Sequence, residues 1–254
     1  MSHICFCRLL FCCVRVSQKL IRSARLSGRM RRIETVVFDV SGVLLDDLHV
    51  VWKADSEAYE ACGFGRIESV EKFKENFKLP IDEYHKSMGV PEEAVPMLEA
   101  EFRRAYQKYN GLIGVFPEVR EVLGRLRDEK IGLAIASNIP SDFLSEHLER
   151  FGLDGYFGVV TGQDDCGEQK PSPEPILSTL SRLGSKPESS AYVGDMEQDM
   201  IAGKRAGVWA IAICREEGYH ACWRLKRQGP DFVIFNLHGL LRVISDLNAE
   251  GKGR

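Results

Sequence analysis

Residues 36–47 read VVFDVSGVLLDD, and this stretch decides the fold of the chain. The apolar run that begins at Ile33 stops at the carboxylate of Asp39, and the chain then turns through Gly42. A short run of β-branched and aliphatic residues is typical of a strand that is buried on both faces of a parallel sheet. The stretch therefore predicts a buried first strand whose carboxyl end presents Asp39.

The rest of the chain divides into a helical region and an alternating region. Residues 48–111 lack strand signals and look helical, with breaks at Pro80 and Pro91. From Pro117 onward, helices alternate with strands, and the expected strands are 131–136, 157–160, 191–193, 209–213 and 232–235. This alternation indicates a parallel sheet with helices on both faces. We therefore expect an α/β fold: a Rossmann-like core of residues 33–46 and 113–247, and a helical cap of residues 47–112 inserted after the first strand.

Charge is unevenly distributed along the 254 residues, whose net charge is −3. Residues 1–33 contain eight Lys or Arg and no acid, so the remaining 221 residues carry 26 bases and 37 acids, a net charge of −11. An acidic body argues against nucleic acid as a partner. The apolar run of the basic segment is interrupted at Arg8 and Arg15, so it is shorter than the roughly 20 residues that span a bilayer. We expect no stable membrane insertion.

We interpret residues 1–32 as a basic, cysteine-containing and disordered extension, with Met30 as a possible start of translation. A transit peptide or an acylated segment is the alternative. The cysteines are Cys5, Cys7, Cys12, Cys13, Cys62, Cys166, Cys214 and Cys222, and they lack the paired spacing of a zinc site. They are interpreted as reduced thiols of a cytoplasmic protein.

Polar residues follow four of the expected strands. In parallel α/β sheets a ligand binds beyond the carboxyl ends of the strands, so these residues converge on one edge. They are Asp39 after the first strand, Ser137 and Asn138 after the second, Lys170 in the loop beyond the third, and Asp195 and Asp199 after the fourth. Acids, a hydroxyl and a lysine at one edge predict a site for phosphate and metal.

Each of these side chains has a chemical and a structural interpretation. Asp39 can attack phosphorus as a nucleophile, or it can cap a turn. Asp195 and Asp199 can hold Mg²⁺, and Asp199 can also cap a helix. Lys170 can stabilise a transferring phosphoryl group, or it can be a solvated loop lysine. Ser137 can donate to a phosphoryl oxygen, or it can cap a helix.

The motifs FDVSGVLLDD, AIASN, KPSPEPIL and YVGDMEQDMIAGKRAG resemble, in order and spacing, the four motifs of the haloacid dehalogenase-like (HAD) superfamily. The resemblance covers about residues 33–247, and the inserted helices resemble the cap of the phosphoglycolate-phosphatase-like branch. It implies a nucleophile at Asp39 and Mg²⁺ held by Asp39, Asp195 and the main-chain carbonyl of Ser41, with support from Asp199.

The resemblance also implies a phosphate-binding hydroxyl at Ser137 and a phosphoryl-stabilising lysine at Lys170. We place substrate binding at Gly42, Ser137, Asn138 and Lys170. The cap adds candidates for the pocket by location only: Trp52, Tyr84, His85, Arg103 and Arg104.

Ser41 departs from the family pattern. Phosphatases of this family usually carry a second aspartate there as the general acid and base, and a serine has no usable proton near neutral pH. We expect a Mg²⁺-dependent phosphatase that hydrolyses a small phosphorylated metabolite through an aspartyl-phosphate on Asp39, as a monomer or homodimer. A proton would then come from water or the cap.

Two alternatives remain open. The first is a phosphonate hydrolase with a Schiff-base lysine in the cap, for which Lys53, Lys72, Lys74 and Lys78 are candidates by location. The second is a catalytically weak protein that binds a phosphorylated ligand. Dehalogenation is disfavoured, because dehalogenases of this family lack the metal-binding pair that Gly194 and Asp195 form in this sequence.

Overall fold

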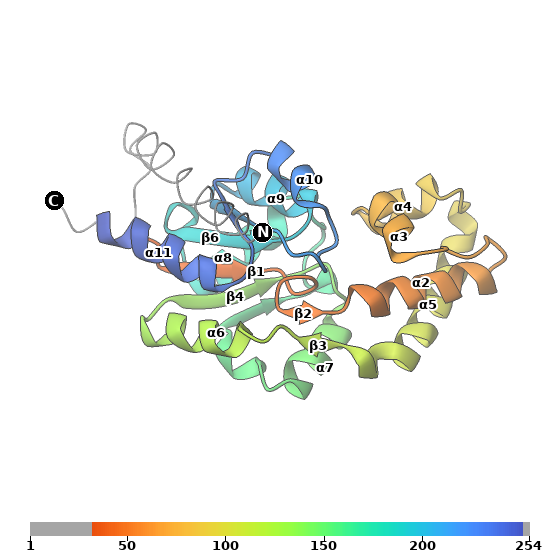
Figure 1. The fold of residues 1–254 in the computed structure, drawn as a ribbon, viewed down its shortest axis with the longest axis horizontal. Coiled ribbons are helices and arrows are strands. Elements are labelled where there is room, and N and C mark those ends of the chain that lie inside the picture. Colours follow the sequence, from red (N-terminus) through yellow and green to blue (C-terminus); the bar gives the residue numbers. More distant parts are fainter. Residues whose placement is uncertain (1–31, 251–254) are drawn as a thin grey trace, which may run out of the picture.

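The computed structural model describes residues 32–250, and its core is a six-stranded sheet flanked by helices (Figure 1). Every neighbouring pair of strands in this sheet is parallel. From one edge to the other, the strands are β5 (Val159–Thr161), β4 (Gly132–Ala136), β1 (Thr35–Phe38), β6 (Ser190–Gly194), β7 (Trp209–Ile213) and β8 (Phe232–Ile234). This order confirms the predicted α/β fold with a Rossmann-like sheet.

β1 is fully buried. It pairs with β4 on one side and β6 on the other, and helices cover both of its faces. Val36 and Phe38 belong to the apolar cluster that includes residues of α6, α7 and α11, whereas Val37 packs with residues of α8 and α9 on the other face. Full burial of an apolar side chain contributes about 1.5–3 kcal/mol. The flanking helices are α6 (Val119–Asp128), α7 (Ser141–Arg150), α8 (Glu174–Leu183), α9 (Glu197–Ala206) and α11 (His238–Glu250). Burial of β1 thus fixes Asp39 near the middle of the sheet's carboxyl edge.

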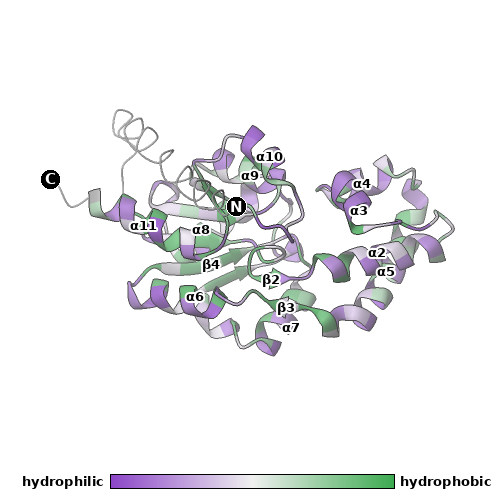
Figure 2. Cartoon of the chain, in the orientation of Figure 1, coloured by the Kyte–Doolittle hydropathy of each residue, from purple (hydrophilic) through white to green (hydrophobic). Residues whose placement is uncertain are grey.

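Hydropathy follows the same layers. Figure 2 shows strongly hydrophobic colouring on the strands of the sheet, whereas the flanking helices carry both hydrophobic and hydrophilic residues. A helix that covers a sheet buries one face and leaves the other in water, which produces this mixture. Among the described residues, no helix has the length and apolar character needed to cross a bilayer.

A two-stranded ribbon joins the sheet to the inserted helices. β2 (Leu45–Asp46) pairs antiparallel with β3 (Gly114–Val115), so the chain leaves and returns at one place. Between them lie α2 (Leu48–Ala61), α3 (Val70–Asn76), α4 (Ile81–Ser87) and α5 (Val95–Tyr109), grouped at one end of the sheet in Figure 1. The sequence did not reveal the ribbon, because strands of two residues have no periodicity. We keep the name cap for residues 47–112, and their status as a separate domain stays a prediction.

The interpretation of all the cysteines as reduced thiols is wrong for one pair. Cys214 and Cys222 form a disulfide, whereas Cys62 and Cys166 are free. Cys214 directly follows β7 and Cys222 begins α10 (Cys222–Arg227), and the loop between these elements brings the two Cα atoms to 5.0 Å. A separation of eight residues did not show this return of the chain.

Some sequence-based predictions need adjustment or lie outside the structure. The strand expected at 157–160 spans Val159–Thr161, because a 3₁₀ turn at Asp154–Tyr156 leads into it. The interpretation of residues 1–32 as a disordered extension, the start at Met30 and the four cysteines of that segment lie outside the described residues, apart from Arg32.

Candidate functional site

Three neighbouring strands bring the predicted site residues to one edge. Asp39 follows β1, Ser137 follows β4 and Asp195 follows β6. The Ser137 hydroxyl donates a hydrogen bond of 2.8 Å to Oδ1 of Asp39, across 98 residues of sequence. The convergence that the strand ends predicted is therefore present, and Ser137 contacts Asp39 directly.

Lys170 is completely buried and lies between two carboxylates. Its Nζ is 2.8 Å from Oδ2 of Asp39 and 2.8 Å from Oδ1 of Asp199, and it donates a third hydrogen bond of 2.9 Å to the Tyr192 hydroxyl. An ammonium group has three donors, so all of them are satisfied. Burial lowers the pKa of Lys170, but Asp199 and Asp39 outweigh burial and raise it. The interpretation as a solvated loop lysine is wrong, because a charged lysine is held against Asp39.

Three buried carboxylates stand together at this edge. Asp39, Asp195 and Asp199 each offer an oxygen, and these oxygens lie within 4.8 Å of one another. Burial raises the pKa of Asp39, and the Asp199 charge raises it further, although Lys170 and Ser137 oppose both effects. Burial, followed by the charge of Asp199, raises the pKa of Asp195 well above its usual range. Carboxylates crowded in this way are stabilised by a cation.

Asp195 and Asp199 differ in the hydrogen-bond partners of their carboxylate oxygens. Oδ2 of Asp195 accepts a hydrogen bond of 2.7 Å from the Tyr219 amide, while Oδ1 is buried without a hydrogen-bond partner among the described residues. Asp199 is different, because Oδ1 contacts Lys170 and Oδ2 accepts a hydrogen bond of 2.9 Å from the Met196 amide. Asp195 therefore offers an unused oxygen of the kind that Mg²⁺ binds, whereas Asp199 orients its neighbours.

The two other predicted substrate contacts have different surroundings. Gly42 has φ +69°, and a Cβ atom built there would lie 2.1 Å from Oδ2 of Asp195. Glycine is therefore required so that the loop after β1 can pass Asp195. Asn138 lines a pocket, and its Oδ1 accepts a hydrogen bond of 3.2 Å from the Lys170 amide. Asn138 faces the pocket, whereas Gly42 is absent from its lining.

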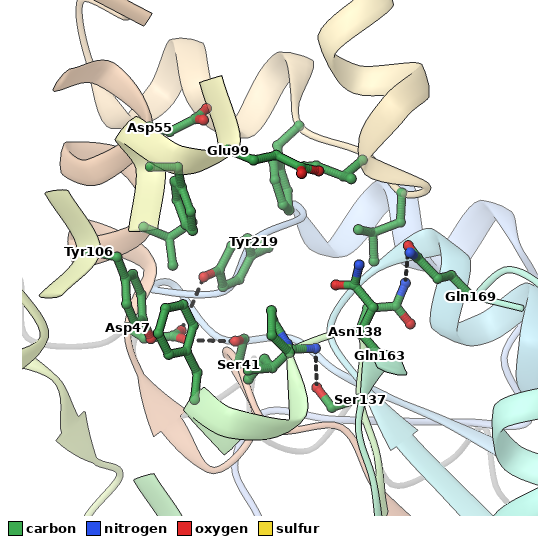
Figure 3. Close-up of a pocket in the computed structure, with 18 of the residues that line it drawn as sticks. Ser41, Asp47, Asp55, Glu99, Tyr106, Ser137, Asn138, Gln163, Gln169 and Tyr219 are labelled. Carbon is green, nitrogen blue, oxygen red and sulfur yellow. Dashed lines mark hydrogen bonds between the residues drawn. The ribbon is translucent and has the colours of Figure 1, made fainter. Parts of the chain in front are cut away.

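The sequence reasoning missed Asp47, which contacts Ser41. The Ser41 hydroxyl donates a hydrogen bond of 2.5 Å to Oδ2 of Asp47, and the Tyr219 hydroxyl donates one of 3.2 Å to Oδ1 (Figure 3). Asp47 is the N-cap residue of α2, yet its side chain makes no capping hydrogen bond. Burial raises its pKa to about 7, against the lowering effect of these two hydroxyls. In the sequence, Asp47 looks like an ordinary acid at the start of a helix, and the pattern of the motif does not reveal its contact with Ser41.

A pocket of about 320 Å³ lies over the strand ends and reaches under the cap. Figure 3 shows Asp55 and Glu99 on cap helices opposite Ser41 and Ser137. Of the cap candidates, His85 and Arg103 line the pocket. The other three are absent from the lining: Trp52 donates to the Ile67 carbonyl, Tyr84 donates to the pocket residue Asp55, and Arg104 donates to Glu101.

The cap lysines do not reach this pocket. Lys53, Lys72, Lys74 and Lys78 are absent from its lining. Lys72 pairs with Glu75 at 2.9 Å, and Lys74 donates to the Glu216 carbonyl at 3.0 Å. A Schiff-base lysine must contact the substrate, so this arrangement disfavours the phosphonate-hydrolase alternative.

Comparison with known proteins agrees with this geometry. The model of the haloacid dehalogenase-like hydrolase family matches residues 36–213. The chain belongs to the haloacid dehalogenase-like hydrolases. Within this family it is phosphoglycolate-phosphatase-like. It is 30% identical over 248 residues to the phosphoglycolate phosphatase of Salmonella typhimurium strain LT2, and the matched region covers 85% of this chain and 94% of the relative.

Other relatives of this hydrolase are named for a different activity or show the fold alone. It is 25% identical over 218 residues to the pyrophosphatase PpaX of Oceanobacillus iheyensis, covering 84% of this chain and 98% of the relative. A solved structure described as a predicted phosphatase from Clostridium acetobutylicum has a TM-score of 0.77 at 20% identity, covering 85% of this chain and all of the other (100%). The activities named for these relatives therefore differ within one fold.

Proposed function

We propose that this hydrolase is a phosphatase that cleaves a small phosphomonoester through an aspartyl-phosphate on Asp39. The observation that carries the proposal is the environment of Asp39, which is buried at the end of β1 with Ser137 on one oxygen and Lys170 on the other. A carboxylate nucleophile needs donors beside it to stabilise the charge of the transferring group. The relatives named as phosphoglycolate phosphatase and pyrophosphatase support phosphorus chemistry.

The reaction has two steps. An oxygen of Asp39 forms a bond to phosphorus while the ester bond to the leaving alcohol breaks, and the alcohol oxygen takes up a proton from water or from the Asp47 carboxyl group. Water then attacks phosphorus, which releases inorganic phosphate and restores the Asp39 carboxylate. Ser137 and Lys170, whose donors face Asp39, stabilise the equatorial oxygens of the phosphoryl group in both steps.

The donor set at the strand ends fits Mg²⁺. Asp39, Asp195 and the main-chain carbonyl of Ser41 would hold the ion, while Asp199 keeps Lys170 and the loop after β6 in place. The unpartnered oxygen of Asp195 is the observation that supports the fit. When bound, the ion neutralises charge on the phosphoryl oxygens.

The test is phosphate release from 4-nitrophenyl phosphate by the full chain, with and without Mg²⁺, beside Asp39→Asn. We expect metal-dependent release that the variant loses, because an amide cannot form the phosphoenzyme. Asp46→Asn, at an exposed position in the same motif, is the matched control and should retain activity. Activity retained by Asp39→Asn would exclude the phosphoenzyme. Ligand binding without turnover by the wild type would support the catalytically weak alternative.

A further inference from the structure

The lining of the pocket is mainly apolar. Its walls come from α2, from the segments on either side of α4's start, from α5, and from the loop after β4 with the start of α7. The side chains that form this apolar wall include Phe77, Leu79, Ile81, Phe102, Ile139 and Phe143. Its volume of about 320 Å³ is at the lower end of the range for small-molecule sites, roughly 300–1,000 Å³. The space beyond the phosphoryl group therefore suits a small, apolar leaving group.

The charged side chains of the lining are almost all acids. Asp47, Asp55, Glu99 and Asp164 line the pocket in addition to Asp39. Asp55 is 4% exposed and accepts a hydrogen bond of 2.7 Å from the Tyr84 hydroxyl, so it is fixed in the cap. A second negative group on the substrate would therefore face carboxyl groups, which offer it no opposite charge.

The basic side chains of the lining are already engaged. The Arg103 guanidinium is 2.7 Å from Oδ2 of Asp142 and lies 4.7 Å from the centre of the Phe143 ring. His85 is buried, its Nδ1 is 2.9 Å from the Tyr59 hydroxyl, and burial lowers its pKa. Among the described lining residues, both basic side chains thus have partners other than a leaving-group carboxylate, and the partner of Arg103 is an exposed aspartate.

We propose that the substrate is a phosphomonoester of a small apolar alcohol that carries no negative charge besides its phosphate. This inference rests on the proposed phosphatase function and narrows it. A carboxylate in the apolar part of the pocket would lose its hydration without gaining a partner. Phosphoglycolate, which gives the Salmonella relative its name, has such a carboxylate on its leaving group. It is therefore a poor substrate for this pocket, despite the relationship of the two sequences.

The test compares benzyl phosphate, 4-carboxybenzyl phosphate and phosphoglycolate with the full chain in Mg²⁺. The two benzyl esters differ by a remote carboxylate and have leaving alcohols of similar acidity. We expect kcat/KM for benzyl phosphate to exceed the other two values by at least about tenfold. Equal or higher values for either anionic ester would overturn the inference, because they would show that Arg103 or another cation turns to meet the carboxylate.

A pair of variants tests whether the pocket charge sets this preference. Glu99→Lys adds a cation to the lining, whereas Glu93→Lys adds the same charge at an exposed position outside it. Glu99→Lys should raise the ratio of 4-carboxybenzyl to benzyl turnover at least about fivefold, and Glu93→Lys should leave it nearly unchanged. The same ratio in both variants would contradict the role of the lining charge.

The outcomes separate this inference from the proposed function. Metal-dependent turnover of 4-nitrophenyl phosphate with no preference among the three esters would overturn the proposed substrate class but would leave the proposed phosphatase function supported. No turnover of any phosphate ester would overturn both proposals.

Discussion

The Ser41 hydroxyl donates a hydrogen bond of 2.5 Å to Oδ2 of Asp47, six residues further along the same motif. Asp47 has given up the capping hydrogen bond that an aspartate at a helix start usually makes, which stabilises a helix by about 1 kcal/mol. Its side chain turns instead into the pocket, where Tyr219 holds the other oxygen. A carboxyl group thus stands behind the serine that replaces the family's second aspartate.

We expect Asp47→Asn to affect poor leaving groups most. An alkoxide needs a proton as it departs, whereas 4-nitrophenolate leaves without one, and loss of a general acid typically costs about 10²–10⁴-fold in rate. Hydrolysis of benzyl phosphate should therefore fall steeply while hydrolysis of 4-nitrophenyl phosphate changes little. Steady-state kinetics on both esters decide the matter, with Asp46→Asn as the control. An equal loss on both would show that Asp47 acts only through the structure.

Ser41→Ala separates the two roles of this residue. The variant removes the hydroxyl that contacts Asp47 but keeps the main-chain carbonyl that would bind the ion. We expect an unchanged Mg²⁺ concentration for half-maximal activity, together with slower turnover of benzyl phosphate. A magnesium titration of each protein measures both quantities. A large shift in the Mg²⁺ requirement would mean that the hydroxyl, and not the carbonyl alone, supports the metal.

Lys170→Met should damage both stability and activity. The substitution leaves the buried carboxylates of Asp39 and Asp199 without the ammonium that lies 2.8 Å from each. Breaking a buried ion pair by removing one partner costs about 3–5 kcal/mol. Urea unfolding should show this loss. The double variant Lys170→Met with Asp199→Asn removes one of the two buried carboxylates that lost their partner. Compared with Lys170→Met alone, it should recover part of the stability, while activity stays low. No recovery would show that the charges are not the cause.

The sequence was sufficient for the sheet and for the residues that follow its strands. Burial of β1 on both faces is encoded in its apolar run, and parallel strands must present their carboxyl ends at one edge, so Asp39, Ser137 and Asp195 could be placed together. Lys170 could be assigned to the same edge from its place in the loop beyond the third expected strand, but that loop has no periodic pattern, so the sequence left open whether the side chain is buried against Asp39 or solvated.

What the sequence could not supply depends on side-chain direction. Asp47 at the start of α2 is expected to cap the helix, and nothing in the motif says that its carboxyl group turns to Ser41. The same holds for Arg103, which lines the pocket as expected but pairs with Asp142 of α7, and the sequence did not show this pairing. The disulfide between Cys214 and Cys222 arises from the path of the loop after β7, which spacing alone does not fix.

Asp55 makes the stability of the protein depend on pH. Burial raises its pKa from 3.8 to about 7, with the Tyr84 hydrogen bond opposing. Between these values the unfolded chain has lost the proton and the folded protein keeps it, so the unfolded state binds fewer protons and stability falls as pH rises. One pKa unit corresponds to about 1.4 kcal/mol, so the contribution amounts to a few kcal/mol. It is fully present below pH 4 and is lost as pH rises through 7.

Asp55→Asn should remove this dependence, because an amide keeps the size of the side chain and an acceptor for Tyr84 but does not ionise. We expect the variant to gain stability relative to the wild type between pH 4 and pH 8. Urea unfolding at both pH values gives the difference, and Asp46→Asn, exposed on β2, should follow the wild type. Other buried carboxyl groups titrate equally in both proteins, so only the difference reports on Asp55. A constant difference across this range would mean that Asp55 is ionised throughout.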